Sequence, residues 1–69
     1  MFNRRKLQAQ MVLKGKTVDD VAKEIGLNPA TFYRKMNRDG DFSRKEIQNI
    51  IIALEISDPM DIFFAEEFA

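Results

Sequence analysis

The sequence contains no cysteine, no histidine and no tryptophan, and only three glycines and two prolines in 69 residues. Without cysteine the chain forms no disulfide and has no thiolate to bind a metal ion. Without histidine it lacks the most common general base and the usual nitrogen ligand of zinc sites. We therefore expect neither a metal nor another cofactor.

Long hydrophobic runs are also missing. The longest, residues 50–54, has five residues, whereas a membrane-spanning helix needs about 20. The first residues are charged, but no apolar segment follows them, so they do not resemble a signal peptide. These features predict a cytoplasmic protein that contacts no membrane and folds as one domain over residues 1–69.

The sequence offers no arrangement typical of an enzyme. Its adjacent carboxylates, at positions 19–20 and 66–67, would project in different directions from a helix and so would not converge on one site. It has no Gly-rich phosphate loop and no nucleophile paired with a base. We expect a non-enzymatic protein with no small-molecule substrate.

The formal net charge is zero, but the charges are divided unevenly along the chain. Residues 1–45 contain all eleven basic side chains and five acidic ones, a net charge of +6. Residues 46–69 contain six acidic side chains and no basic one. This asymmetry favours a polyanionic partner for the first part of the chain. The alternative is a segregated, salt-bridged surface without such a partner.

Hydrophobic residues recur with helical spacing, and no segment alternates with a period of two. Capping residues and glycines divide the chain into five predicted helices, at about residues 4–14, 18–25, 29–37, 44–54 and 59–64. The sequence therefore predicts an all-α domain. The expected core stripes of the first four helices are Leu7 and Met11; Val18, Val21, Ala22 and Ile25; Phe32 and Met36; and Ile47, Ile50, Ile51 and Leu54.

A three-residue turn separates the second and third predicted helices. Gly26 suits the left-handed backbone of a tight turn. Ala22 is small enough for two helices to cross closely, and Phe32 would anchor the third helix on the second. This pattern, over about residues 17–37, is that of the helix-turn-helix motif of DNA-binding domains.

The same residues carry a resemblance to a known family. Residues 17–22, 25–28 and 31–32 resemble the XRE-type helix-turn-helix family, which includes phage Cro and lysogeny repressors. The resemblance covers residues 3–64 and implies a compact five-helix fold like that of lambda repressor. It also implies a sequence-specific transcriptional regulator, in a bacterial or phage-infected cell, that binds operator DNA with helix 29–37 in the major groove. The family often has Gln where this chain has Val18.

The face of helix 29–37 opposite Phe32 and Met36 would meet the bases. At about 100° per residue, this face carries two arginines with small or polar side chains and no acid. Arg34 is the strongest candidate, because a guanidinium can pair with O6 and N7 of guanine; the alternative is a solvated surface arginine. The predicted base contacts are Ala30, Thr31, Arg34, Asn37 and Arg38.

Phosphate contacts are expected around the starts of the second, third and fourth helices, since helix N-termini attract anions. Arg4, Arg5 and Lys6 either reach the DNA backbone as an arm or only solubilise the first helix. The predicted phosphate contacts near these starts are Lys16, Thr17, Asn28, Ser43, Arg44 and Lys45, and Tyr33, Lys35 and Arg38 are further candidates.

The end of the chain, about residues 50–69, carries more apolar side chains than one small domain readily buries, which favours a symmetric homodimer. The predicted interface residues are Ile52, Phe63, Phe64 and Phe68. Alternatively, these aromatic side chains fold back into the core. A second functional alternative is a protein-interaction module, an antitoxin or adaptor, that binds its partner through the acidic, Phe-rich C-terminus.

Overall fold

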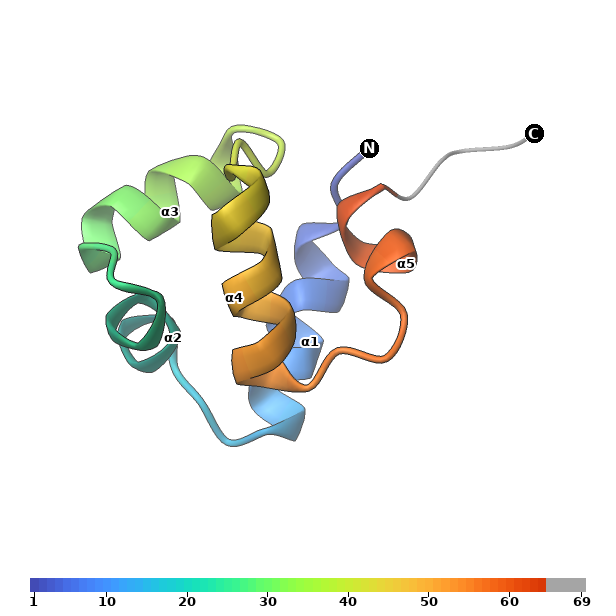
Figure 1. The fold of residues 1–69 in the computed structure, drawn as a ribbon, viewed down its shortest axis with the longest axis horizontal. Coiled ribbons are helices and arrows are strands. Elements are labelled where there is room, and N and C mark those ends of the chain that lie inside the picture. The colour runs from blue at the N-terminus through green and yellow to red at the C-terminus, as the bar shows by residue number, and fades with distance from the viewer. Residues whose placement is uncertain (65–69) are drawn as a thin grey trace.

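The computed structural model describes residues 1–64, and this range contains five helices (Figure 1). They are α1 (Arg4–Leu13), α2 (Val18–Ile25), α3 (Pro29–Asn37), α4 (Arg44–Leu54) and α5 (Pro59–Phe63). No strand occurs among residues 1–64, so the all-α prediction is confirmed. Every predicted helix is found within one residue of its expected ends, and the two that differ, α1 and α5, each end one residue early.

Local hydrogen bonds explain where the helices begin. At each helix the N-cap side chain accepts a hydrogen bond from a backbone N–H of the first turn. The bonding is reciprocal between Thr17 and Asp20 at α2, and between Ser43 and Glu46 at α4, which makes each pair a capping box. Both boxes follow from the sequence pattern alone. The N-cap residues are Asn3, Thr17, Asn28, Ser43 and Asp58.

The core collects the apolar stripes of all five helices. Every stripe predicted for the first four helices faces it, with eight residues buried and four partly buried against them. α2 packs against both α3 and α4, and the small Ala22 on α2 is completely buried. The buried core residues are Leu7, Met11, Val21, Ala22, Phe32, Met36, Phe42, Ile50, Leu54, Ile56, Ile62 and Phe63.

Four phenylalanines meet where the N-terminus, the loop after α3 and helix α5 come together. The ring centroid of Phe42 lies 5.2 Å from that of Phe32, 6.0 Å from Phe2 and 6.5 Å from Phe63. The prediction that places Phe63 in a dimer interface is wrong. Its ring packs against Phe2 and Phe42, and Phe63 is only 6% exposed. Burial of a large apolar ring in the core is favourable because it removes the ring surface from water. Phe68 lies outside the described residues.

The loop between α3 and α4 holds the N-terminal segment in place. Gly40 has a φ of 69°, and a Cβ at this position would collide with the ring of Phe2. The backbone N–H of Asn3 donates to the carbonyl oxygen of Ile62 over 2.7 Å. The start of α1 is therefore fixed beside both this loop and α5.

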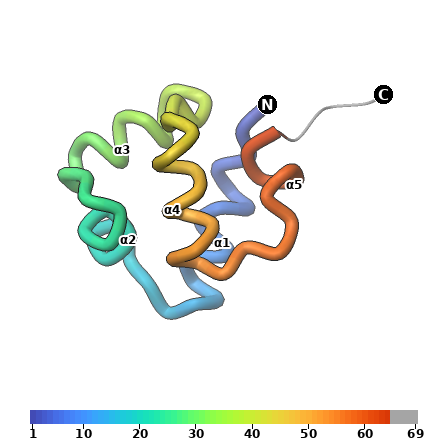
Figure 2. Tube along the Cα trace, in the orientation of Figure 1, coloured from blue at the N-terminus to red at the C-terminus, as the bar shows by residue number. Residues whose placement is uncertain are grey.

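Helix α4 runs through the middle of the molecule in Figures 1 and 2, with α2 and α3 on one side and α5 on the other. The C-terminal end of α3, the start of α4 and the N-terminus lie along one edge (Figure 2). None of the helices within residues 1–64 has the length and apolar character needed to cross a bilayer.

Candidate nucleic-acid interface

A tight turn sets the position of α3 relative to α2. Gly26 ends α2 in the left-handed conformation, with a φ of 77°, and the N–H of Leu27 donates to the carbonyl oxygen of Ala22 over 2.8 Å. Leu27 packs against the core. Asn28 then caps α3 by accepting a hydrogen bond from the N–H of Ala30 over 2.8 Å. The two helices and their turn form a helix-turn-helix-like unit, with α3 along one edge of the molecule (Figure 1).

Helix α3 turns one face to the core and the opposite face to solvent. Phe32 and Met36 are buried on the inner face. Of the five predicted base contacts, four are exposed and Thr31 is half-buried. Arg34 and Arg38 form no ion pair with any of residues 1–64. The four exposed candidates are Ala30, Arg34, Asn37 and Arg38.

Lysines, not arginines, make the four ion pairs found among the described residues. Within residues 1–64, none of the arginines is paired with a carboxylate. Four of the six lysine charges are therefore paired within the protein, while the arginine charges remain available to an anionic partner. The pairs are Lys6–Asp61, Lys14–Glu55, Lys16–Glu24 and Lys35–Glu46.

Two lysines predicted to contact phosphates are partly buried and already paired with a carboxylate of the protein. Nζ of Lys16 donates to Glu24 over 2.8 Å and to the carbonyl oxygen of Ala53 over 2.9 Å, near the C-terminal end of α4, where the helix dipole favours a cation. Nζ of Lys35 lies 2.8 and 3.0 Å from the two carboxylate oxygens of Glu46, and its side chain is only 22% exposed. Neither lysine points freely toward a DNA backbone.

In the capping boxes of α2 and α4, a carboxylate of the protein already occupies a backbone N–H group at the start of the helix. The backbone N–H of Thr17 donates to the Asp20 carboxylate over 2.9 Å, and that of Ser43 donates to Glu46 over 2.8 Å. These two candidates therefore already hold a carboxylate at the N–H group that a phosphate would use. At α3, by contrast, no acidic residue lies in the first turn after Asn28, so this N-terminus suits a phosphate.

Both capping carboxylates carry lowered pKa values. The backbone N–H and the hydroxyl of Thr17 hold the pKa of Asp20 below its ordinary value of 3.8. Burial raises the pKa of Glu46, but hydrogen bonds from Lys35 and Ser43, with the lysine charge, outweigh it and bring the pKa below its ordinary value of 4.5. Both groups are ionised at neutral pH and accept hydrogen bonds from the N–H groups of Thr17 and Ser43.

The other phosphate candidates remain accessible. Arg44 and Lys45 are exposed in the first turn of α4, and their side chains make no hydrogen bond or ion pair within the described range. Tyr33, on α3, is 48% exposed. Arg44 and Lys45 are the first two residues of α4, and α4 begins close to the C-terminal end of α3 (Figure 1).

Arg4 makes a polar contact within the protein. The sequence left two roles open for this residue, an arm that reaches the DNA backbone or a side chain that only solubilises the first helix. Its Nη1 donates to Oδ1 of Asn37 over 2.8 Å, which joins the first turn of α1 to the end of α3. The two residues are 33 positions apart, so no local pattern in the sequence indicates the contact. Asn37 is thus a predicted base contact whose side-chain oxygen already has a partner.

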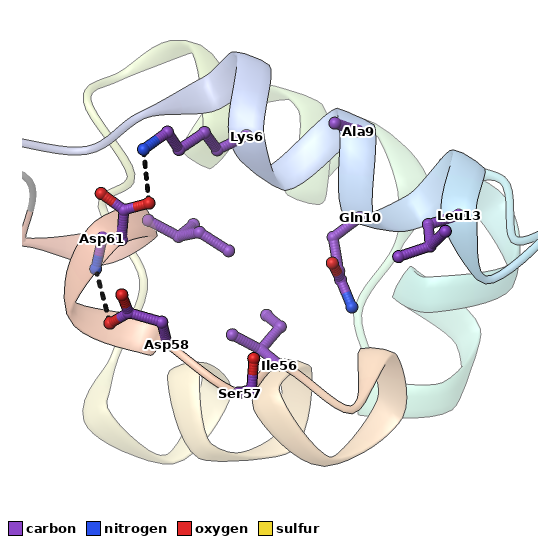
Figure 3. A pocket seen from close by; sticks show the side chains of 9 residues that line it. Lys6, Ala9, Gln10, Leu13, Ile56, Ser57, Asp58 and Asp61 are labelled. Carbon is purple, nitrogen blue, oxygen red and sulfur yellow. Dashed lines mark hydrogen bonds and ion pairs between the residues drawn. The ribbon is translucent and has the colours of Figure 1, made fainter.

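A surface groove of about 430 Å³ lies between α1 and the segment that leads into α5 (Figure 3). Four of the polar side chains that line it, those of Lys6, Gln10, Asp58 and Asp61, bond within the protein. Lys6 pairs with Asp61, Asp58 accepts a hydrogen bond from the backbone N–H of Asp61, and Gln10 donates to the carbonyl oxygen of Leu54 over 2.8 Å. Within residues 1–64, no group of three or more potential metal ligands comes together. We assign no ligand to this groove.

Two predicted dimer residues are exposed. Ile52 is 74% exposed and borders a shallow hollow with Glu24 and Asn49. Phe64 is 52% exposed and follows α5 as its C-cap residue. Ile52 lies in α4, whereas Phe64 lies at the end of α5. Both remain predicted dimer contacts.

Comparison of the chain with protein-family models, with curated proteins and with solved structures finds no significant match. Its function is therefore inferred from its own residues and their arrangement.

Proposed function

We propose that this protein is a sequence-specific DNA-binding transcriptional regulator of phage repressor or Cro type, which places α3 in the major groove. The observation that carries the proposal is the exposed face of α3. There Arg34 and Arg38 are unpaired with any described carboxylate, while Phe32 and Met36 fix the opposite face to the core. An α-helix of about 10–12 Å diameter fits a major groove of about 12 Å width.

The charges around α3 support the same function. Arg44 and Lys45 at the start of α4, with the N-terminus of α3, would bind phosphates and fix the register of α3 on the duplex. The formal net charge of zero predicts modest affinity for DNA of random sequence. Discrimination between a specific site and random DNA then depends on base contacts and on the pairing of two protomers, whose α3 helices would lie about 34 Å apart.

Selection of bound duplexes from random DNA, at one stated salt concentration, tests this function. We expect the wild-type protein to enrich one sequence. Arg34→Ala should bind that sequence more weakly by about 1–3 kcal/mol and should lose discrimination at one base pair, since a guanidinium that pairs with guanine is removed. Titrations of labelled duplexes that carry single base changes measure both effects.

Lys14→Ala is the matched control. It also removes one positive charge, but from the end of α1, where Lys14 pairs with Glu55. We expect this variant to keep the wild-type affinity and base preference, because the exposed ion pair contributes little to folding. An equal loss of binding in both variants would show that only total charge matters. A wild-type protein that enriches no sequence even at low salt would refute the proposed function.

A further inference from the structure

The contact between Arg4 and Asn37 determines how the Asn37 amide is oriented. Nη1 of Arg4 donates to the side chain of Asn37 over 2.8 Å. A guanidinium has N–H donors and no acceptor, so the amide atom that faces it must be Oδ1. The Nδ2 group of Asn37 therefore points away from Arg4, and Asn37 offers its two N–H donors to whatever approaches the exposed end of α3.

Packing fixes the backbone from which Arg4 extends. Asn3 caps α1 through its side chain, and its N–H is bonded to the carbonyl oxygen of Ile62. Phe2 packs into the space left by the missing side chain of Gly40. A hollow of about 190 Å³ at this junction is lined in part by Phe2, Arg4 and Asn37. The first turn of α1 is thus held at the end of α3, so the contact does not rely on a mobile arm.

This orientation limits the bases that Asn37 can recognise. An asparagine that reads adenine must accept a hydrogen bond from the N6 amino group with its oxygen while its Nδ2 donates to N7. Oδ1 of Asn37 keeps a second lone pair, but an N6 amino group that approached it would meet the positively charged N–H donors of Arg4 beside it. Guanine presents two acceptors, N7 and O6, on the same groove edge. Donors from Asn37 and Arg4 are compatible with guanine and unfavourable for adenine.

We propose that Arg4 is a positioning residue that sets base specificity through Asn37. By holding Oδ1, it makes Asn37 a hydrogen-bond donor toward DNA and favours guanine over adenine at the base that Asn37 contacts. The proposal rests on the proposed function, because it requires α3 to lie in the major groove of a specific duplex.

Selection from random DNA with the wild type and three variants tests the proposal. Asn37→Ala identifies the position that depends on Asn37, because the preference there is lost. At that position the wild type should favour guanine over adenine. Arg4→Met, which keeps a long side chain but has no N–H donor, should shift the guanine-to-adenine ratio toward adenine by about fivefold or more. Arg5→Met, at the next and also exposed position of α1, should leave the ratio unchanged.

Asn37→Asp is the second test of the same contact. The carboxylate still accepts a hydrogen bond from Arg4 but has no N–H donor, so the guanine preference should disappear while the link between α1 and α3 persists. A purely structural role of Arg4 would instead weaken binding to all sequences and leave the base ratio unchanged. This distinction holds even if Arg4→Met folds poorly, because Asn37→Asp keeps the Arg4 contact.

Three results would overturn the proposal: a wild-type preference for adenine at the Asn37-dependent position, no position that depends on Asn37, or an Arg4→Met profile identical to that of the wild type. Each can occur while the wild type still enriches a specific sequence. Failure of the wild type to enrich any sequence is a separate result, which overturns the proposed function and this inference together.

Discussion

Lys35 and Lys45 carry the same charge in the same region of the chain, yet the structure gives them opposite surroundings. Lys35 is bound by Glu46, whereas Lys45 is exposed and makes no ion pair within residues 1–64. Lys45→Ala should weaken binding to all DNA sequences alike and reduce the slope of log affinity against log salt by about 1, because one phosphate contact is lost. Affinity measurements over a range of salt concentrations give this slope.

Lys35→Ala provides the contrast to Lys45→Ala, since each removes one lysine. We expect Lys35→Ala to lower the free energy of unfolding by about 1–2 kcal/mol, because it leaves the half-buried Glu46 carboxylate without its cation. Its salt slope should stay near that of the wild type. A slope that falls in Lys35→Ala and is unchanged in Lys45→Ala would contradict this assignment.

At the level of elements, Glu46 connects α4 to α3 through Lys35 and closes the capping box with Ser43. Because its pKa in the folded protein is below the ordinary value of 4.5, Glu46 contributes stability at and above that pH. The contribution is lost as the pH falls through the lowered pKa. Glu46→Gln should reduce the free energy of unfolding at pH 7 by about 1 kcal/mol, and its difference from the wild type should shrink in acid. Urea unfolding at several pH values measures this.

Glu55→Gln is the matched substitution for this test. A hydrogen bond from Lys14 and the lysine charge lower the pKa of Glu55, but the side chain of Glu55 is 70% exposed. Solvent screens such a pair, so Glu55→Gln should change stability and its pH dependence much less than Glu46→Gln. Equal effects of the two substitutions would argue against a special role for the Lys35–Glu46 contact.

The elements were predictable because their signals are local. Thr17 and Ser43 start helices through bonds to residues three positions later, and Gly26 ends α2 through its own backbone conformation. The apolar stripes gave the buried faces for the same reason, since helical spacing alone decides which side chains share a face. The exposed face of α3, with Arg34 at its centre, was found in this way.

What the sequence did not indicate depends on contacts between distant segments. In the sequence, Lys16 before α2 and Lys35 in the last turn of α3 look like any other basic residues until the positions of Glu24 and Glu46 are known. Phe63 resembles an exposed aromatic residue until Phe2 is seen packed against it from the other end of the chain. Such pairings follow from the tertiary fold and not from spacing along the chain.

For the whole molecule, the test of dimer formation is the contrast between two adjacent phenylalanines. Phe64→Ala should weaken self-association and leave the stability of the monomer nearly unchanged, because Phe64 is exposed. Phe63→Ala should instead lower the free energy of unfolding by about 3–5 kcal/mol, because its ring is part of the core. Sedimentation of both variants and the wild type, with urea unfolding, separates the two effects.

The dimer prediction has a clear negative result. If the wild type sediments as a monomer at high micromolar concentration and on a specific duplex, and Phe64→Ala behaves identically, Phe64 is not part of a dimer interface. In that case one protomer would occupy one half-site. Two protomers on one duplex, with half-sites about one DNA turn apart, are the expected arrangement.

Because the ion pairs of residues 1–64 leave the arginines of α3 unpaired, this fold is a workable scaffold for changing sequence preference. The ion pairs that link distant segments involve side chains other than those on the outer face of α3. The exposed positions 30, 34 and 38 can therefore be randomised in a library while Phe32, Lys35 and Met36 stay constant and keep α3 attached to the core. Variants with new target sequences should then inherit the parent's stability, so selection can act on recognition alone.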